Sequence, residues 1–149
     1  MSQSYIIRET DQYYPLSVLF HDSGMEIEVS DTPPSGMVKM WRLDYVESGE
    51  LISAATLQIR DGVYTLGDIA VREDHRNEGF GRQMQKVVFD EARKMGVKEI
   101  WGSAKVPDYY YHLGWKKMDW DTSPKVGVNC HTCSRRGISC FPAIIKMSL

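Results

Sequence analysis

The most informative part of the sequence is REDHRNEGFGRQM, residues 72–84. Within it Gly79 and Gly81 stand two residues apart, immediately before an amphipathic run begins. The N-terminus of a helix presents unpaired amide N–H groups and a partial positive charge, and both favour a bound anion. Glycine removes the Cβ from the approach and tolerates a positive φ, while Arg76 and Arg82 add charge. The stretch therefore predicts a diphosphate cradle built mainly from backbone, the alternative being an ordinary glycine-rich helix start.

The cradle follows neither of two common nucleotide-binding patterns. A Walker A loop needs a lysine and a hydroxyl residue after its second glycine, and Arg82 and Gln83 stand there instead. The dinucleotide pattern G-x-G-x-x-G needs a third glycine, which this stretch lacks. The sequence therefore argues against both of these classes of nucleotide site.

On either side of the cradle, apolar residues recur at regular spacings that predict secondary structure. After it, apolar residues recur on one face of a helix that Gly96 terminates: Phe80, Met84, Val87, Val88, Ala92 and Met95. Before it, strand-like patterns predict three strands with short turns and hence antiparallel pairing, over residues 37–46, 50–60 and 63–71. Asp61 and Gly62 form the strongest turn signal. The third strand carries apolar residues on both faces, which indicates a central position.

The remaining segments complete a mixed domain. Residues 5–8 predict a first strand, and Thr10 or Asp11 is expected to cap a helix in which Pro15 allows only a first-turn start or a kink. Later segments predict a strand parallel to residues 63–71, a short helix and two further strands, over residues 98–104, 107–114, 115–120 and 141–149. This order predicts one α/β (α+β, three-layer) domain over residues 1–149, with a central mixed, mostly antiparallel sheet flanked by helices.

Composition narrows the function classes. The chain has 149 residues, 42% hydrophobic and 26% charged, which fits one soluble domain of ordinary size. A net charge of -2 gives no basic surplus for nucleic acid, and no apolar run approaches the length of a membrane span. The N-terminal residues lack the features of a signal peptide, and the three cysteines do not form a secreted disulfide framework. We therefore expect a cytoplasmic protein without nucleic-acid or membrane partners.

Two motifs together resemble a known family. LGDIAVREDHRNEGFGRQMQKVVFDEARKMG, residues 66–96, is similar to the acyl-CoA-binding core of the GNAT family of N-acetyltransferases, whose loop R/Q-x-x-G-x-G/A matches residues 76–81 here. YYYHLGW, residues 109–115, resembles the family's aromatic-Tyr-x-x-x-Gly-aromatic element through Tyr109, Tyr110, Gly114 and Trp115. The two motifs have the family's order and spacing, and they cover about residues 66 to 116. The resemblance implies a GNAT-like acyl-CoA N-acyltransferase fold.

The resemblance also implies acetyl-CoA as acyl donor. Backbone N–H groups from Asn77 to Arg82 are expected to hold the CoA pyrophosphate, and the strand from Ile69 to Val71 to pair with the pantetheine arm. That strand and residues 98–104 are expected to splay apart and admit the thioester. The expected cofactor-binding residues are Ile69, Ala70, Val71, Arg76, Asn77, Glu78, Gly79, Phe80, Gly81 and Arg82. The family often has an asparagine before the tyrosine-bearing helix, and Ser103 or a neighbour stands there instead.

Acetyl transfer to an amine needs an acid and a base. An alkylammonium group has a pKa of about 10.4, so a base must take its proton, directly or through water, while the departing thiolate benefits from a proton. Tyr110 is the candidate acid, a role that the resemblance supports, and the alternative is simple packing among three adjacent tyrosines. Asp68 is the candidate base, because a carboxylate in an apolar central strand is costly unless used or paired. A surface-facing or salt-bridged Asp68 is the alternative, and His75 and His112 are the other candidate bases.

The late cysteines fit no part of this pattern. Cys130, His131, Cys133 and Cys140 have the residue types of a Cys₃His zinc site, but a second C-x-x-C is missing, so we predict reduced cysteines and no metal.

These observations lead to one functional hypothesis and two alternatives. The hypothesis is an acetyl-CoA-dependent N-acetyltransferase that acts on a small-molecule or peptide primary amine by direct transfer in a ternary complex. No cysteine stands at the expected thioester position, so no acyl-enzyme is expected. The alternatives are a non-catalytic acyl-CoA sensor on the same fold and a metal-dependent interaction module on the cysteine tail. The resemblance also suggests a homodimer.

Overall fold

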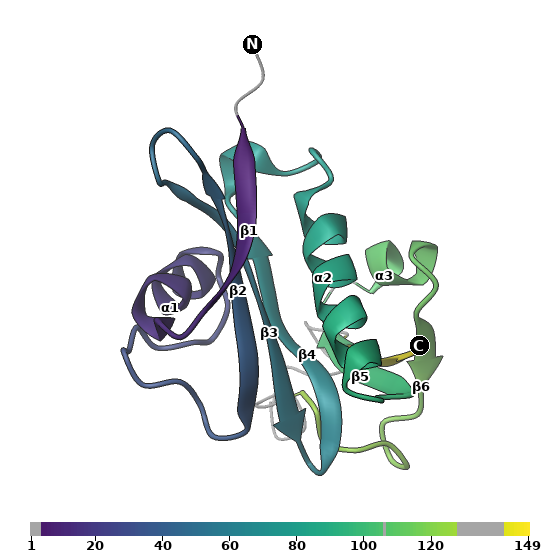
Figure 1. Cartoon of the computed structure of the whole chain (residues 1–149). Coiled ribbons are helices and arrows are strands. Elements are labelled where there is room, and N and C mark those ends of the chain that lie inside the picture. Colours follow the sequence, from purple (N-terminus) through teal and green to yellow (C-terminus); the bar gives the residue numbers. More distant parts are fainter. Residues whose placement is uncertain (1–3, 106, 128–141) are drawn as a thin grey trace. The chain divides into compact units, whose positions relative to one another are not determined.

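The computed structural model describes residues 4–105, 107–127 and 142–149. Figure 1 labels their helices and strands. These residues form two compact units. The first unit comprises Met1–Gln58 and Leu66–Glu91, and the second comprises Ile59–Thr65 and Ala92–Leu149. No helix in the described residues is long and apolar enough to cross a bilayer.

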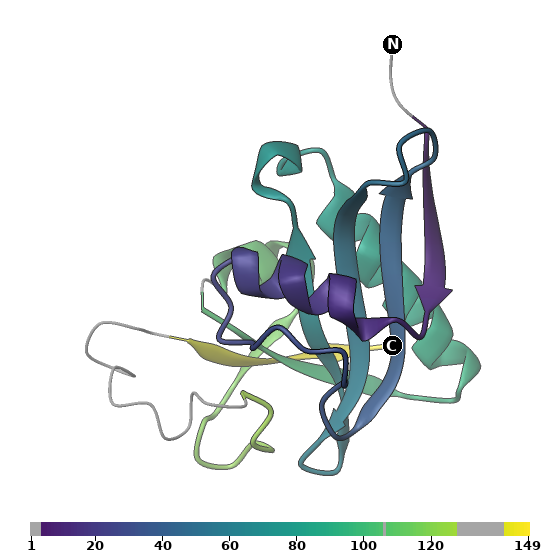
Figure 2. The ribbon, with the colours of Figure 1, turned by 90° about the vertical axis from the view of Figure 1, so that its left-hand side faces the viewer.

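The first unit is a layer of strands with a helix on each face. Its elements in chain order are β1 (Tyr5–Thr10), α1 (Tyr13–Asp22), β2 (Met37–Tyr45), β3 (Leu51–Arg60), β4 (Val63–Val71), the 3₁₀ turn η1 (Glu73–His75) and α2 (Phe80–Lys94), of which β3, β4 and α2 run on into the second unit. The strands lie in the order β1-β2-β3-β4, and β2 pairs antiparallel with both β1 and β3. Figures 1 and 2 show α1 and α2 on opposite faces of these strands.

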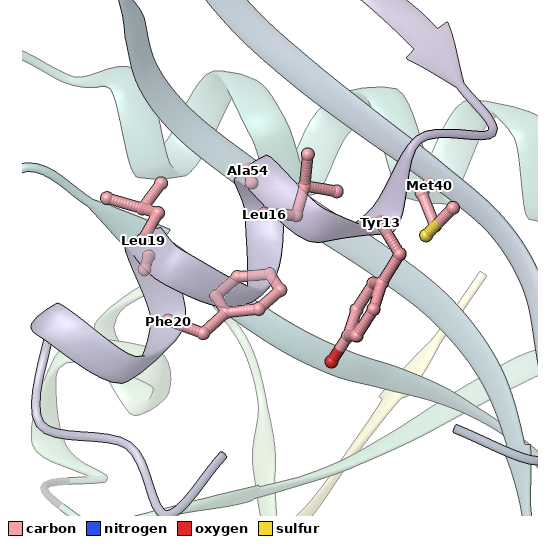
Figure 3. Close-up of a cluster of buried hydrophobic side chains, with 7 residues drawn as sticks. Tyr13, Leu16, Leu19, Phe20, Met40 and Ala54 are labelled. Atoms are coloured by element: carbon pink, nitrogen blue, oxygen red, sulfur yellow. The ribbon is translucent and has the colours of Figure 1, made fainter. Parts of the chain in front are cut away.

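The core on the α1 side confirms the first predicted helix. Four side chains of α1 point at the strands and pack with Met40, Ala54 and Ala70, as Figure 3 shows for the labelled residues: Tyr13, Leu16, Leu19 and Phe20. Pro15 lies in the first turn, where its missing N–H breaks no helical hydrogen bond. The predicted cap is wrong, because β1 continues through Thr10 and the N-cap is Gln12, without a side-chain cap bond. Thr10 Oγ1 instead accepts the Gln12 N–H at 3.1 Å.

Helix α2 follows its predicted period and is terminated by Gly96, as predicted. Met84, Val88 and Ala92 are fully buried, whereas Met95, the last residue of the predicted apolar face, is 40% exposed and lies just after the helix. Gly96 takes a φ of 82°, and its N–H donates to Arg93 O at 3.0 Å. Val97 N–H also donates to Ala92 O at 3.0 Å, and these two bonds together form a Schellman end.

The second unit has strands and one short helix. Its elements, besides the hairpin of β3 and β4, are β5 (Glu99–Ala104), α3 (Asp108–His112), β6 (Lys116–Met118) and β7 (Ala143–Ser148). Thr65 of β4 pairs with Trp101 of β5 in parallel, as predicted, and β7 pairs antiparallel with both β5 and β6. Trp101, Val126 and Ile144 form the core of this unit.

The strand order confirms the predicted fold class. Hydrogen bonding gives the order β1-β2-β3-β4-β5-β7-β6, a mixed and mostly antiparallel sheet. The hairpin turn is also confirmed, because Asp61 and Gly62 have φ of 49° and 79°, the two positive values of a type I′ turn. The last strand, β7, lies between β5 and β6 in this order, which the sequence pattern did not predict.

Candidate functional site

The glycine loop contains two left-handed residues. After η1 the backbone takes a φ of 68° at Asn77 and 82° at Gly79, and α2 then begins at Phe80. A Cβ at Gly79 would meet nothing within 4 Å, so a glycine is favoured here by the backbone angle and not by lack of space. Gly81 lies inside α2. The sequence analysis named Asn77 as a cofactor-binding residue but did not predict its left-handed backbone, although asparagine is one of the few residues that tolerate this conformation.

The start of α2 presents donors to the loop. Its hydrogen-bond ladder begins with Gln83 N–H donating to Gly79 O at 3.1 Å. The amides before Gln83 have no intrahelical acceptor, which is the general property of a helix N-terminus. The loop itself is open to solvent, because every residue from Arg76 to Gly79 is exposed, and so is Arg82. Several N–H groups and two arginines therefore surround one exposed bend.

Phe80 fixes this bend to the rest of the first unit. Its side chain is buried, and its ring packs edge-on against the ring of Tyr5 with 5.2 Å between centroids. The Tyr5 hydroxyl donates to Gln83 Oε1 at 2.6 Å. The first turn of α2 is thus held against β1 by two contacts, which orients its amide groups.

Near its C-terminal end, β4 is hydrogen-bonded to β3 along one of its two edges. Ser53 Oγ donates to Ala70 O at 2.8 Å, and Arg72 N–H donates to Ile52 O at 2.8 Å. Successive backbone groups of a strand point to opposite edges, so those of Ile69 and Val71 face away from β3. Arg76 Nε donates to Val71 O at 3.3 Å. The edge of β4 that faces away from β3 therefore ends beside the glycine loop.

Asp68 is held by side chains of β3. Its side chain is half-buried, and Asp68 Oδ2 accepts a hydrogen bond from Gln58 Nε2 at 3.2 Å. Its backbone N–H donates to Thr56 Oγ1 at 2.9 Å, and Gln58 Nε2 also donates to that oxygen at 2.9 Å. At Gly67 there is no room for a side chain, because a Cβ would lie 2.6 Å from Thr56 Oγ1.

Sequence reasoning missed this Thr56–Gln58 support. Both residues are buried polar residues of β3, at 0% and 1% exposure, and they meet Asp68 across the hairpin. The available signal was Gly67, because a glycine inside a strand often marks a close approach of another group.

Tyr110 lies in α3 of the second unit. It is half-buried, and its ring packs edge-on against those of Trp115 and Tyr109, at 6.0 and 5.3 Å. Burial, and after it the neighbouring Tyr109, raises the pKa of Tyr110 to about 12. Trp115 N–H donates to Tyr110 O at 3.1 Å around Gly114, whose φ is 99°. The phenol is therefore protonated at neutral pH and can donate a hydrogen bond.

The two histidine candidates differ in their surroundings. His112 is the last residue of α3 and is exposed, as expected of a helix-surface residue. His75 ends η1, and its Nδ1 lies 3.1 Å from Tyr45 Oη and 3.1 Å from Glu78 Oε2. His75 is thus connected to the glycine loop itself.

The candidate zinc ligands Cys130, His131, Cys133 and Cys140 lie outside the described residues. Among the residues that the structure does describe, no three histidine, cysteine, aspartate or glutamate side chains gather as a metal site.

The predicted site residues are divided between the two units. Asp68, the strand Ile69 to Val71 and the loop from Arg76 to Arg82 belong to the first unit, and Tyr110 belongs to the second. A separate hollow of about 640 Å³ on the first unit contains none of the predicted site residues, and its lining comes from β1, β2 and nearby loops: Arg8, Glu9, Thr10, Asp11, Gln12, Pro33, Met37, Val38, Lys39 and Met40.

Comparison with known proteins identifies the family and the fold of the chain. The sequence model of the acetyltransferase (GNAT) family matches residues 3–115, and no curated protein matches the chain. Over 100% of its length the chain resembles an N-acetylglutamate synthase from Neisseria gonorrhoeae, complexed with coenzyme A and N-acetyl-glutamate, with a TM-score of 0.71 and 15% identity. This chain covers 36% of that protein.

Two similar structures have about the same length as this chain. The ribosomal-protein-S18-alanine N-acetyltransferase from Escherichia coli has a TM-score of 0.66 and 18% identity, over 97% of this chain and 94% of that one. A GNAT family acetyltransferase from Elizabethkingia anophelis, with acetyl-CoA bound, has a TM-score of 0.61 and 18% identity, over 99% and 100%. At these identities the likeness shows a shared fold.

Proposed function

Because this chain belongs to the GNAT acetyltransferase family, we propose that it transfers the acetyl group of acetyl-CoA to a primary amine, directly and in a ternary complex. The observation that carries the proposal is the start of α2, where exposed amides follow two left-handed residues, Asn77 and Gly79. The acyl donor supplies a thioester, which is an activated acetyl group. The residues of this chain supply binding, orientation and proton handling.

The loop suits a diphosphate. Amide groups at a helix N-terminus and the guanidinium groups of Arg76 and Arg82 favour two adjacent negative charges. The empty space at Gly79 lets a phosphate approach the backbone closely. Glu78 is the one acidic residue between Arg76 and Arg82, and its carboxylate contacts His75. We therefore assign the pyrophosphate of CoA to the amides from Asn77 to Arg82.

The outward edge of β4 suits the pantetheine arm. Amide groups along an extended strand bind an amide-containing chain as another strand would. The backbone groups of Ile69 and Val71 face that edge, whereas the Ala70 carbonyl accepts from Ser53. We therefore narrow the backbone contacts to Ile69 and Val71, and we expect Arg76 to release the Val71 carbonyl when the cofactor binds.

Tyr110 suits the role of a donor to the departing sulfur. A thiol has a pKa of about 8.5, so complete proton transfer from a phenol whose pKa is about 12 runs uphill. A hydrogen bond from the protonated phenol to a thiolate still stabilises the developing charge. The role of general acid that the sequence predicted is thereby narrowed to that of hydrogen-bond donor.

Asp68 suits the role of base. Gln58 fixes one of its carboxylate oxygens, and a carboxylate can accept at several lone pairs. We propose that Asp68 takes the proton of the attacking ammonium, directly or through one water. The cost of this transfer falls if the amine is desolvated when it binds.

The test is an amine panel with acetyl-CoA, in which free thiol release is followed. The panel contains small amines, free amino acids and peptides, because the acceptor class is open. The proposal predicts turnover with at least one class, and a Tyr110→Phe variant that loses turnover on the order of 100-fold while it keeps its CoA affinity. CoA binding without turnover for any acceptor would support the alternative, an acyl-CoA sensor on the same fold.

Three broader assignments belong to the same proposal. We infer that residues 1–149 act as one GNAT-like domain, that the protein works in the cytoplasm, and that it can form a homodimer. The similar structures in hand cover nearly all of the chain, which supports the first assignment.

A further inference from the structure

The glycine loop contains a carboxylate, Glu78, which has the same sign of charge as the proposed diphosphate ligand. Glu78 stands between the two left-handed residues, Asn77 and Gly79, and its side chain is 50% exposed. A carboxylate just before a helix interacts favourably with the unpaired amides and the helix dipole. Glu78 is therefore in the right place to compete with a diphosphate for the same donors, or to repel it.

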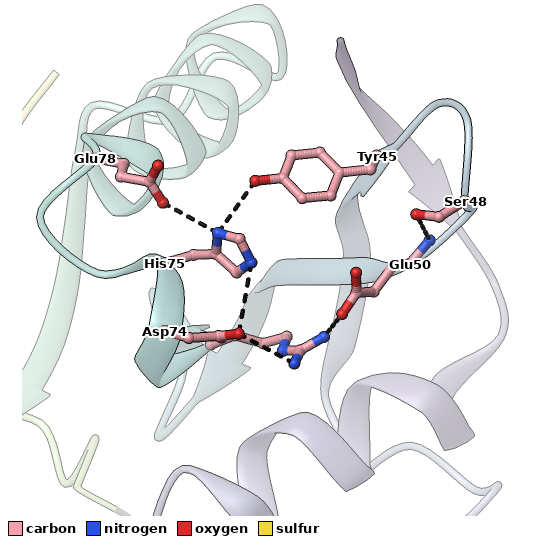
Figure 4. Close-up of polar contacts among 7 residues, drawn as sticks. Tyr45, Ser48, Glu50, Asp74, His75 and Glu78 are labelled. Carbon is pink, nitrogen blue, oxygen red and sulfur yellow. Dashed lines mark hydrogen bonds and ion pairs between the residues drawn. The ribbon is translucent and has the colours of Figure 1, made fainter. Parts of the chain in front are cut away.

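His75 holds that carboxylate. His75 Nδ1 lies 3.1 Å from Glu78 Oε2, and the His75 side chain is only 18% exposed (Figure 4). A carboxylate oxygen only accepts hydrogen bonds, so Nδ1 must carry the hydrogen and donate. The Tyr45 oxygen lies 3.1 Å from the same nitrogen, and the two rings pack edge-on with 5.3 Å between centroids. The imidazole thus contacts both Tyr45 of β2 and Glu78 through the same nitrogen.

Carboxylates lie near both ring nitrogens of this histidine. Asp74 Oδ2 lies 3.7 Å from His75 Nε2, and Glu78 faces the other nitrogen. Arg72 pairs with Asp74 and with Glu50, the residue just before β3. The segment from Arg72 to Glu78 is therefore connected through side chains to β2 and to Glu50, immediately before the exposed amides.

We propose that His75 is a positioning residue for the cofactor loop, which holds the Glu78 carboxylate away from the amides that receive the diphosphate. This inference rests on the proposed function, because it concerns the same acyl-CoA site. It assigns His75 to cofactor affinity and not to proton transfer from the amine. Removing His75 releases Glu78, and removing the charge of Glu78 makes His75 unnecessary.

A double-mutant cycle tests the proposal, with Kd for CoA measured by calorimetry. His75→Leu is expected to weaken CoA binding about fivefold, and Glu78→Gln to strengthen it by about twofold. In the Glu78→Gln background, His75→Leu is expected to cost less than about twofold, because the released side chain is no longer charged. His75→Asn keeps a donor near the position of Nδ1 and is expected to restore most of the affinity.

Two controls separate positioning from folding. His21→Leu removes an exposed histidine of α1 and is expected to leave Kd at the wild-type value. In turnover assays, His75→Leu is expected to raise KM for acetyl-CoA far more than it lowers kcat. An equal loss in both Glu78 backgrounds would mean that His75 merely supports the fold, and it would overturn the proposal.

The outcomes also separate this inference from the proposed function. Wild-type protein that binds no CoA contradicts both. Wild-type protein that binds CoA, together with His75→Leu that binds equally well, contradicts the role of His75 alone and leaves the acetyltransferase proposal standing.

Discussion

Gln58 fills the space that a side chain at Gly67 would need, beside the candidate base Asp68. A Cβ built on Gly67 would lie 2.6 Å from Cδ of Gln58, the side chain whose amide donates to Asp68. Gln58 is 1% exposed, so it has little freedom to move away. The glycine therefore lets a buried amide reach across β4 and orient the carboxylate.

Gly67→Ala is expected to destabilise the protein and to misplace Asp68. Overpacking a buried site costs about 1–3 kcal/mol in the free energy of unfolding, and chemical denaturation measures it. Gly102→Ala is the matched control, because a Cβ there would meet its nearest neighbour at 3.5 Å, an ordinary contact. Equal stabilities of the two alanine variants would contradict the close approach of Gln58.

Asp68→Asn is expected to lower kcat without weakening CoA binding. The amide keeps the size of the carboxylate but cannot take a proton from the amine, so turnover falls on the order of 100-fold. Steady-state kinetics and CoA titration give the two quantities. A variant with wild-type kcat would remove Asp68 from the mechanism.

Tyr110 is expected to make the protein sensitive to alkali. Its pKa is raised to about 12 from an ordinary value of 10.0, so between these two pH values the folded state holds a proton that the unfolded state has lost. The free energy of unfolding therefore falls as the pH rises through this window, and below pH 10 the contribution is fully present. Denaturation of wild type and Tyr110→Phe across this range should show a shallower fall for the variant. Parallel curves would contradict the burial of this phenol.

The two loop glycines are expected to respond differently to alanine. Gly79 has a φ of 82°, where an alanine costs about 1–2 kcal/mol, so Gly79→Ala should destabilise the loop and weaken CoA binding roughly tenfold. Gly81 lies inside α2, where alanine stabilises a helix by about 0.5–1 kcal/mol. Thermal unfolding of the two variants should thus shift in opposite directions, and a shift in the same direction would refute the assigned conformations.

The parts of the fold that were predicted correctly depend on local patterns. The type I′ turn at Asp61 and Gly62 needs two residues that tolerate positive φ, and the period of α2 needs only its own apolar residues. The terminator Gly96 was also predicted from its own residue type, whereas the exposure of Met95 was not, because Met95 continues the apolar pattern. The insertion of β7 between β5 and β6 is a long-range pairing, which no local pattern contains.

The part of the site that the backbone forms was predictable from the sequence. The side-chain contacts that form only in the folded protein were not. Two glycines separated by one residue, followed by apolar residues at helical spacing, indicate a helix start with accessible amides, and the structure has that start. The contact of His75 with Tyr45 joins residues 30 positions apart, and the contact of Gln58 with Asp68 crosses a hairpin. Side chains that meet only after folding leave no spacing in the sequence, so these support residues were not predicted.

An NMR titration with coenzyme A that follows individual backbone amides tests the diphosphate cradle at the start of α2. The amides of Gly79, Phe80, Gly81 and Arg82 are expected to shift most, inorganic pyrophosphate is expected to shift the same set, and the amides of α1 are expected not to respond. Coenzyme A that leaves these four amides unchanged at saturating concentration would contradict this cradle.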